Sequence, residues 1–390
     1  MTDFDLELQK RLDALRGQNL FRELRRVDSP QSTRIQIGGK TFLNFSSNDY
    51  LGLANDPGLK EAAIRAIEKF GVGAGASRLI CGSLAPFHEL EEALAQLKRT
   101  EAALSFSSGY ATALGAIGAL LGRDDVIILD KLVHASIVDA AKLCGAKIRV
   151  FAHNDLDDLE EKLIWAKHAK TKTLVITESI FSMDGDAAPL REIVGLKNKY
   201  GAWLMVDEAH ATGILGEKGR GLADELGISN QIEIQMGTLG KALGASGGYI
   251  CGPRALIDLL VNRARSFIFS TAPPPAAAAA AIAAVQFIQS AEGENRRKHL
   301  RERLNQFHSA LRTPHSASRS AIIPIILGDE NEAVAAADEL RKRKIFVPAI
   351  RFPAVARGAA RLRVTLTAAH SAEDVAILAG ALEKIVGRKP

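Results

Sequence analysis

The chain has 390 residues, of which 47% are hydrophobic and 24% charged, a composition typical of a globular protein with a large core. Its net charge of +5 is spread without a long basic run, which argues against a nucleic-acid partner. The three cysteines, Cys81, Cys144 and Cys251, are far apart and match neither a metal site nor a disulfide framework. We therefore expect a reducing, cytoplasmic location.

The N-terminal residues 1–26 are charged throughout, which predicts an amphipathic helix and no apolar signal segment. A strand pair with a Gly-Gly turn is predicted within residues 34–45. The most apolar stretch, residues 271–288, consists of prolines followed by alanines and predicts the start of an interior helix, not a membrane span. No membrane partner is expected.

From about residue 50, helical patterns alternate with short apolar runs. Helices are predicted at 57–70, 86–99, 110–121, 155–169 and 188–200, and strands at 125–130, 147–153, 173–179, 202–208, 232–238 and 247–252. This alternation predicts an α/β fold with a mainly parallel central sheet covered by helices on both faces. A long charged helix at 294–312 then leads to a smaller α+β part, with strands at 321–327 and 361–367 and helices at 333–345 and 372–386. We divide the chain into an N-terminal segment (1–49), a large domain (50–288) and a small C-terminal domain (289–390).

Polar side chains follow four successive predicted strands. They are Asp130 and His134, then Glu178, Ser182 and Asp184, then Asp207 and His210, and finally Thr238 and Lys241. Any one of them has an ordinary explanation, such as a helix cap for Asp207 or a structural role for either histidine. Because ligands of open α/β sheets bind beyond the carboxyl ends of the strands, their joint occurrence predicts a site at that edge.

Several cofactors are poor matches to this pattern. The glycines of residues 71–77 follow a helix instead of a strand, so they do not form a dinucleotide-binding fingerprint. Lys241 is followed by Ala242 where a phosphate-binding P-loop needs Ser or Thr. Metal binding by Asp207, Glu208 and His210 is conceivable but lacks a further His or Cys, and no metal is predicted.

Pyridoxal 5′-phosphate fits better. It needs a lysine for a Schiff base, an acid for its pyridinium nitrogen and backbone N–H groups for its phosphate. Lys241, which lies among glycines, supplies the first and Asp207 the second. The Ser/Gly turn that opens a helix at residues 105–113 supplies the third.

The sequence resembles the α-oxoamine synthases, which are fold-type-I pyridoxal-phosphate transferases. The resemblance runs from residue 44 to 370 and is carried by motifs in family order: NFSSNDYLGL, GAGASRLICG, HELEEALA, FSSGY, HAS, TESIFSMDGDAAPL, VDEAHATGILGEKGRGL, GTLGKALG, FSTAPPP and RLRVTLTAAH. It implies a homodimer with active sites at the subunit interface.

The resemblance also implies roles for individual residues. Lys241, His134 and Asp207 would be catalytic: Lys241 forms the Schiff base, His134 stacks on the cofactor ring and Asp207 pairs with the pyridinium nitrogen. Other cofactor-binding residues would be His210 and Ser182 near the phenolic oxygen, Gly109, Tyr110 and Thr238 on the phosphate side, and Thr271 across the dimer interface. Asn48 and Arg363 would hold the amino-acid carboxylate, and Arg22 and Arg351 would border the acyl substrate. Arg22 could equally be a solvated helix arginine.

FAHNDLDDLE, SRLICG and RLRVTLTAAHS are most similar to the family branch that condenses L-alanine with pimeloyl-CoA or a pimeloyl carrier protein (pimeloyl-ACP), releasing CO2 and a thiol. Glycine-using and serine-using, long-chain members remain alternatives, as does a non-catalytic scaffold with the same fold. The segment RFPAVARG (351–358) departs from the family's RPPTVP, with Ala354 and Ala356 at two altered positions. Acyl-chain selectivity is therefore left open.

Overall fold

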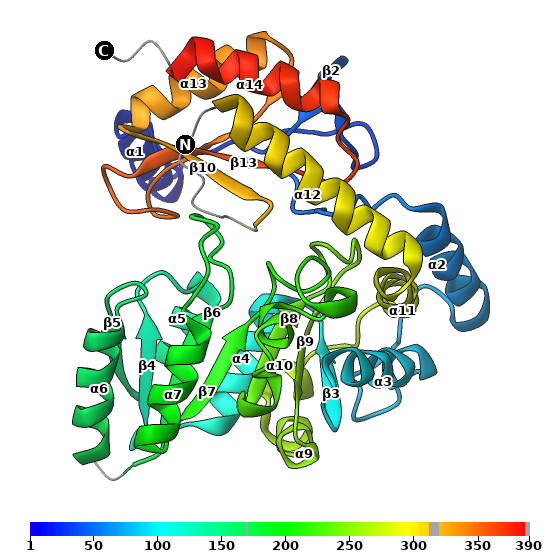
Figure 1. The fold of residues 1–390 in the computed structure, drawn as a ribbon, viewed down its shortest axis with the longest axis vertical. Coiled ribbons are helices and arrows are strands. Elements are labelled where there is room, and N and C mark those ends of the chain that lie inside the picture. Colours follow the sequence, from blue (N-terminus) through cyan, green and yellow to red (C-terminus); the bar gives the residue numbers. More distant parts are fainter. Residues whose placement is uncertain (169–170, 312–319, 387–390) are drawn as a thin grey trace.

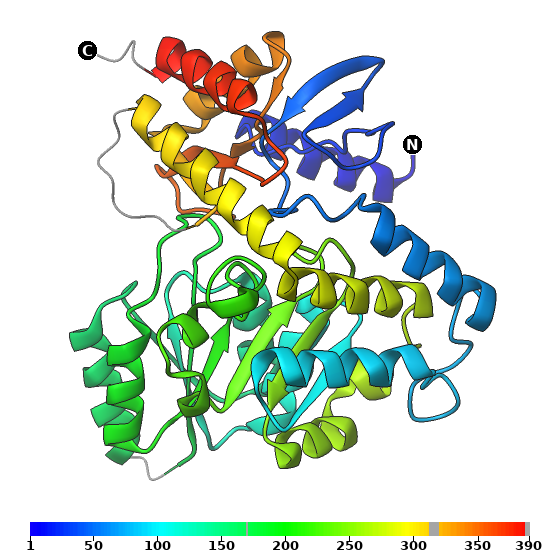
Figure 2. The same ribbon diagram turned by 45° about the vertical axis from the view of Figure 1, so that its right-hand side comes forward.

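The computed structural model describes residues 1–168, 171–311 and 320–386, so positions 169 and 312 of two predicted helices lie outside the described residues. Figures 1 and 2 show a large α/β half and a smaller half stacked on it, with helix α12 (Ala291–Leu311) running from one to the other. Among the described residues, no helix is long and apolar enough to cross a membrane.

The large half is built on a seven-stranded sheet with the order β3-β9-β8-β7-β6-β4-β5. Its strands are β3 (Ala102–Phe106), β4 (Val126–Asp130), β5 (Lys147–Phe151), β6 (Thr173–Glu178), β7 (Trp203–Asp207), β8 (Ile234–Thr238) and β9 (Gly248–Gly252). Strands β8, β7, β6, β4 and β5 run parallel, whereas β9 is antiparallel to both of its neighbours. The predicted mainly parallel sheet is confirmed.

Both faces of the sheet are buried. In β4, Val126 and Ile128 belong to one apolar cluster while Ile127 and Leu129 belong to the other, because successive side chains of a strand point to opposite faces. One cluster contains residues of α2 (Pro57–Phe70), α3 (Ala85–Lys98), α6 (Leu156–His168), α7 (Leu190–Tyr200) and α11 (Pro275–Gln289). The other contains residues of α4 (Gly109–Leu120), α5 (Ala135–Cys144), α9 (Arg254–Arg263) and α10 (Arg265–Ile268). This double burial explains the uninterrupted apolar runs in the sequence.

The smaller half contains two three-stranded sheets. One has the order β10-β13-β12, from Ile322–Gly328, Ala360–Thr365 and Ala349–Ile350, and packs against α13 (Glu330–Lys342), which in turn contacts α14 (Ala372–Val386). The other has the order β1-β2-β11, from Arg34–Ile37, Lys40–Asn44 and Ile345–Phe346. The predicted strand pair is β1 and β2, and both turn glycines, Gly38 and Gly39, have positive φ as a tight hairpin requires.

The predicted helix over residues 1–26 is too long. Helix α1 spans Asp3–Gly17 and ends because Asn19 adopts a left-handed conformation with φ of 54°. None of its residues is buried, so its apolar side chains do not contribute to the core of this chain.

Strands β4, β6, β7 and β8 all end at the edge of the large sheet that faces the smaller half (Figure 1). The chain beyond β7 turns through three short elements, η1 (Glu217–Gly219), α8 (Leu222–Glu225) and η2 (Ser229–Gln231), before it enters β8. The polar residues that follow these strands are therefore gathered between the two halves.

Candidate active site

Two buried carboxyl groups lie side by side at the ends of adjacent strands. Glu178 of β6 and Asp207 of β7 are direct partners in the parallel ladder. Asp207 Oδ1 accepts a hydrogen bond from the Ala209 amide at 2.9 Å, and Glu178 Oε1 accepts one from the His134 amide at 2.5 Å. Burial and the nearby charge of Asp207 raise the pKa of Glu178 to about 8. Burial also raises the pKa of Asp207, while the charge of Lys241 and the hydrogen bond from the Ala209 amide oppose that change.

Lys241 lies in a tight loop that follows β8. The loop is closed by the Leu239 amide, which donates to the Gly247 carbonyl at 2.9 Å, and by the Gly244 amide, which donates to the Lys241 carbonyl at 2.9 Å. Gly244 has φ of 60°, and a Cβ there would lie 2.5 Å from the Ala54 amide nitrogen. Only glycine lets the loop pack this closely, so the glycines around the lysine serve a close approach of two segments.

The Lys241 amine is electrostatically linked to both carboxyl groups. Burial lowers its pKa, while the charges of Asp207 and Glu178 oppose that change. Among the described residues, none forms an ion pair or hydrogen bond with the Lys241 amine. The amine is thus available to react, and its neutral form is easier to reach than for a lysine in water.

Two histidines occupy different environments at this edge. His134 caps helix α5, where its Nδ1 accepts a hydrogen bond from the Ser136 amide at 3.2 Å, and its ring is exposed. His210 is buried, with Nδ1 2.6 Å from the Tyr50 hydroxyl oxygen. Burial lowers the pKa of His210 well below its ordinary value and raises that of Tyr50 to about 12, so both groups are neutral near pH 7.

A buried arginine faces the same edge from the smaller half. Arg363, on β13, donates from Nη1 to Asn48 Oδ1 at 3.0 Å and from Nε to the Ser182 carbonyl at 2.6 Å. Both partners are neutral, and among the described residues Arg363 forms no ion pair. A buried guanidinium without an anionic partner is costly, so this arrangement favours a ligand that brings a carboxylate.

A third part of the site is suited to a phosphate. Thr238 Oγ1, at the end of β8, is buried and has no hydrogen-bond partner among the described residues. Next to it begins helix α4, where a Cβ on Gly109 would lie 2.6 Å from Thr238 Cγ2. The first amides of α4, from Gly109 and Tyr110, lack acceptors within the helix, which makes its N-terminus an anion site. The Tyr110 hydroxyl donates to Asp139 of α5 at 2.7 Å, so its side chain has a partner within the protein.

Three groups match those that hold pyridoxal phosphate: the amine of Lys241, the neighbouring carboxyl group of Asp207, and the unpartnered hydroxyl of Thr238 beside a helix N-terminus. Thr271 lies shortly after the end of α10. It is exposed, bridges to Ser77 and lines a small recess together with Ser105 and Ser107. Within the described part of the chain, no hydrogen bond joins Thr271 to Lys241, so its role stays a prediction.

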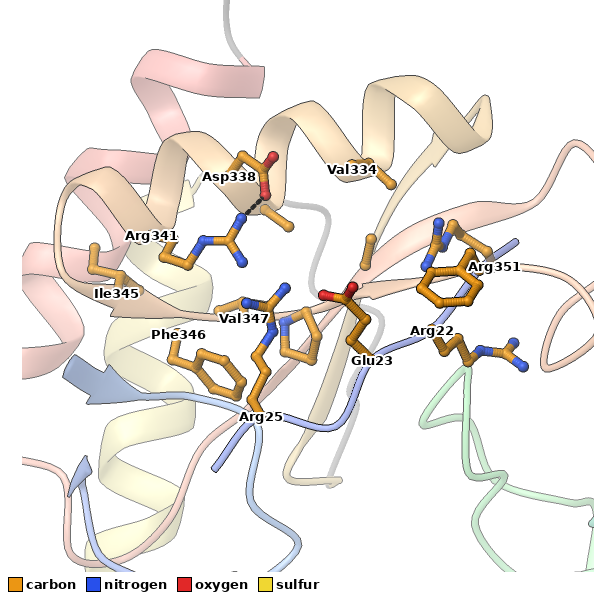
Figure 3. Close-up of a pocket in the computed structure, with 14 residues that line it drawn as sticks. Arg22, Glu23, Arg25, Val334, Asp338, Arg341, Ile345, Phe346, Val347 and Arg351 are labelled. Carbon is orange, nitrogen blue, oxygen red and sulfur yellow. Dashed lines mark hydrogen bonds and ion pairs between the residues drawn. The ribbon is translucent and has the colours of Figure 1, made fainter. Parts of the chain in front are cut away.

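Arg22 and Arg351 lie in a separate cavity of about 480 Å³ between the N-terminal segment and the smaller half. Arg22 Nη2 donates to the Phe352 carbonyl at 3.1 Å, and Arg351 donates to the Asn19 carbonyl. Figure 3 shows these two arginines at one end of the cavity, with Arg25 and Arg341 toward the other. Burial and the charge of Arg22 lower the pKa of Arg351, while the charge of Glu330 opposes that change. The two guanidinium groups repel each other and would be stabilised by an anion.

Two site residues were not assigned roles from the sequence. Tyr50 links His210 to Asn48, whose Oδ1 lies 3.2 Å from its hydroxyl. Glu178 accepts a hydrogen bond from the His134 amide, and its position at a strand end, like that of Asp207, was the sequence feature that could have revealed its role.

Glu208 is not available for the alternative metal site, because it pairs with buried Lys98 and accepts a hydrogen bond from the Ala223 amide at 3.0 Å. Within the described ranges, no group of three His, Cys, Asp or Glu side chains could hold a metal.

The fold is that of a fold-type-I transferase. The chain belongs to the aminotransferase class I and II family, whose model matches residues 40–382.

Two curated relatives are similar along nearly their whole length. A protein from Anaeromyxobacter sp. (strain Fw109-5) is 50% identical over 97% of this chain and 95% of its own, and one from Geotalea daltonii is 47% identical over 97% of each. Both are named 8-amino-7-oxononanoate synthase. Among solved structures, serine palmitoyltransferase from S. paucimobilis, with bound PLP and myriocin, has a TM-score of 0.91 at 30% identity and covers 97% of this chain and 96% of that one.

Proposed function

We propose that this protein condenses L-alanine with a pimeloyl thioester, on CoA or on a carrier protein, to give 8-amino-7-oxononanoate, CO2 and the free thiol, a step of biotin biosynthesis. The observation that carries the proposal is identity of 47–50% to relatives bearing that enzyme's name, over nearly the whole of both chains. The arrangement of Lys241, Asp207 and Arg363 described above supports the proposal.

Pyridoxal phosphate is the cofactor. Lys241 would bind it covalently, Asp207 would hold its ring nitrogen, His134 would cover its ring, and His210 and Ser182 would lie near its phenolic oxygen. Thr238 and the amides of Gly109 and Tyr110 would hold its phosphate. When bound, the cofactor supplies an electron-poor ring that accepts the electron pair left when a bond to the alanine Cα breaks.

Arg363 and Asn48 bind the alanine carboxylate. The guanidinium is already oriented by the Ser182 carbonyl and the Asn48 side chain, so little ordering is needed when the substrate arrives. This contact also fixes the Cα hydrogen relative to the Lys241 amine.

Lys241 removes the proton from the alanine Cα. Burial lowers the pKa of its amine, which raises the fraction of the neutral form that can act as a base. His134 is the candidate donor of a hydrogen bond to the thioester oxygen as the new C–C bond forms and the thiol leaves. The former alanine carboxyl group then leaves as CO2, and the remaining product is 8-amino-7-oxononanoate.

Arg22 and Arg351 bind the far carboxylate of the pimeloyl chain. Both guanidinium groups are held by main-chain carbonyls and form no ion pair within the described part of the chain, so they can accept an anionic ligand. The protein works as a homodimer, with Thr271 reaching the phosphate of the partner's cofactor, and it acts in the cytoplasm. Light scattering of the purified protein would test the dimer.

A substrate matrix tests the function. Alanine, glycine and serine are each assayed with acetyl-, pimeloyl- and palmitoyl-CoA, and thiol release is measured. We expect alanine with pimeloyl-CoA to give the highest kcat/KM. Preference for serine with palmitoyl-CoA, as the name of the similar solved structure would imply, or for glycine with acetyl-CoA, would contradict the proposal.

A further inference from the structure

A histidine outside the site is fixed between two carboxylates from different parts of the sheet edge. His153, two residues beyond β5, places Nδ1 3.0 Å from Asp130 Oδ1 and Nε2 2.8 Å from Asp186 Oδ2. Although burial opposes its charge, the hydrogen bonds that His153 donates to both carboxylates raise its pKa to about 10. Its ring is therefore a cation at neutral pH that donates from both nitrogens.

Asp186 belongs to a loop that closes on itself. The Phe181 amide donates to the Asp186 carbonyl at 3.0 Å, and the Gly185 amide donates to the Phe181 carbonyl at 2.9 Å. The Phe181 ring meets the His153 ring edge-on with centroids 4.3 Å apart. We call residues 181–186 the linking loop. His153 thus contacts the linking loop at both ends, through Phe181 and Asp186, and holds it against the large sheet.

The opposite side of the linking loop contacts strand β13 of the smaller half. Arg361 donates to Asp184 at 2.6 Å, and Arg363 donates to the Ser182 carbonyl at 2.6 Å. Gly185 approaches the smaller half so closely that a Cβ would lie 2.3 Å from the Ile322 carbonyl oxygen. The linking loop therefore connects His153 to Arg363, the arginine proposed to bind alanine.

We propose that His153 is a positioning residue for amino-acid binding: by joining Asp186 of the linking loop to Asp130 of the large sheet, it sets the Ser182 carbonyl that orients the Arg363 guanidinium toward the substrate carboxylate. This inference rests on the proposed role of the site in binding an amino acid. It does not depend on which amino acid or which thioester is used.

His153 acts on substrate binding and not on the chemical step. Arg363 meets the carboxylate before and during the reaction, so weakening its orientation raises KM and leaves kcat nearly unchanged. A residue needed only for folding would instead lower the amount of active protein without changing KM.

The test compares His153→Phe, which keeps a ring against Phe181, and Asp186→Asn with the wild-type holoenzyme. Each variant should bind the amino acid about tenfold more weakly, the factor expected when one charge-assisted hydrogen bond is weakened. The corresponding carboxamide, alaninamide for alanine, lacks the carboxylate charge and should bind within about twofold of wild type. Titration calorimetry measures both affinities. Asp157→Asn, the same change at an exposed residue of α6, should alter neither.

The double variant should bind no more weakly than either single variant, because both changes break the same clamp. Equal weakening of amino acid and amide, or unchanged affinity for both, would overturn the inference. If His153→Phe does not fold, Asp186→Asn carries the same comparison. The calorimetry uses whichever of alanine, glycine or serine the wild type binds. Its result can therefore be interpreted even if the proposed function names the wrong substrate.

Discussion

The sheet edge that carries Lys241 and Asp207, here called the cofactor edge, and the cavity that contains Arg22 and Arg351, here called the acyl cavity, are built in contrasting ways. At the cofactor edge, Glu178 and Asp207 are fixed by a parallel ladder and buried on both sides. In the acyl cavity, Arg22 is exposed and is held, like Arg351, by single hydrogen bonds to main-chain carbonyls. Groups on a rigid sheet suit chemistry that tolerates little displacement, whereas groups on loops can change between relatives without disturbing the fold. The first region should therefore govern the reaction and the second its choice of acyl chain.

Lys241→Ala should have the largest effect. Removal of the amine eliminates both the covalent attachment of the cofactor and the proposed base, so kcat should fall by at least about 10⁴-fold. The absorption band of covalently bound cofactor should also be lost from the purified protein. Lys60→Ala, at an exposed position of α2, is the matched control and should retain both. Substantial turnover by the Lys241 variant would show that the two regions have been assigned wrongly.

Arg363→Met should raise the KM for alanine by roughly a hundredfold, because a buried charge-assisted contact with the carboxylate is lost. The KM for the thioester should change by less than about threefold. Steady-state kinetics with each substrate varied in turn measure both values, and Arg343→Met provides a surface arginine as control. A larger change for the thioester would move Arg363 from the amino-acid region to the acyl region.

Arg22→Gln and Arg351→Gln should each raise the KM for pimeloyl-CoA by about tenfold. Heptanoyl-CoA, which has the same chain length without the terminal carboxylate, should be used equally well by both variants and the wild type. An equal increase in KM for the two thioesters would mean that these arginines do not recognise the terminal carboxylate.

A smaller effect concerns stability and pH. Because folding raises the pKa of His153 from 6.5 to about 10, the charged ring stabilises the folded protein. Its contribution to the free energy of unfolding is fully present below pH 6.5 and is lost as the pH rises toward 10. The Tm of wild type should thus exceed that of His153→Phe most at pH 6, and the difference should shrink by pH 10. Thermal unfolding at several pH values measures this. A Tm difference that grows with pH would contradict a charged clamp between Asp130 and Asp186.

The sheet and its polar edge were accessible from the sequence, since buried parallel strands leave continuous apolar runs and their ends can be read directly. Lys241 and Asp207 could be paired for that reason. The end of α1 was not accessible, because a left-handed Asn19 stops the helix without interrupting the charge pattern. The clamp at His153 was equally hidden: its partners Asp130 and Asp186 are separated from it by 23 and 33 residues and meet only in the folded sheet.

The central claim is a decarboxylative condensation of alanine with a pimeloyl thioester. The most direct measurement supplies L-alanine labelled with ¹³C in its carboxyl group, together with pimeloyl-CoA, and follows the label by mass spectrometry. The account predicts one labelled CO2 for each thiol released and an unlabelled 8-amino-7-oxononanoate. Label retained in the product, or thiol release without labelled CO2, would contradict it.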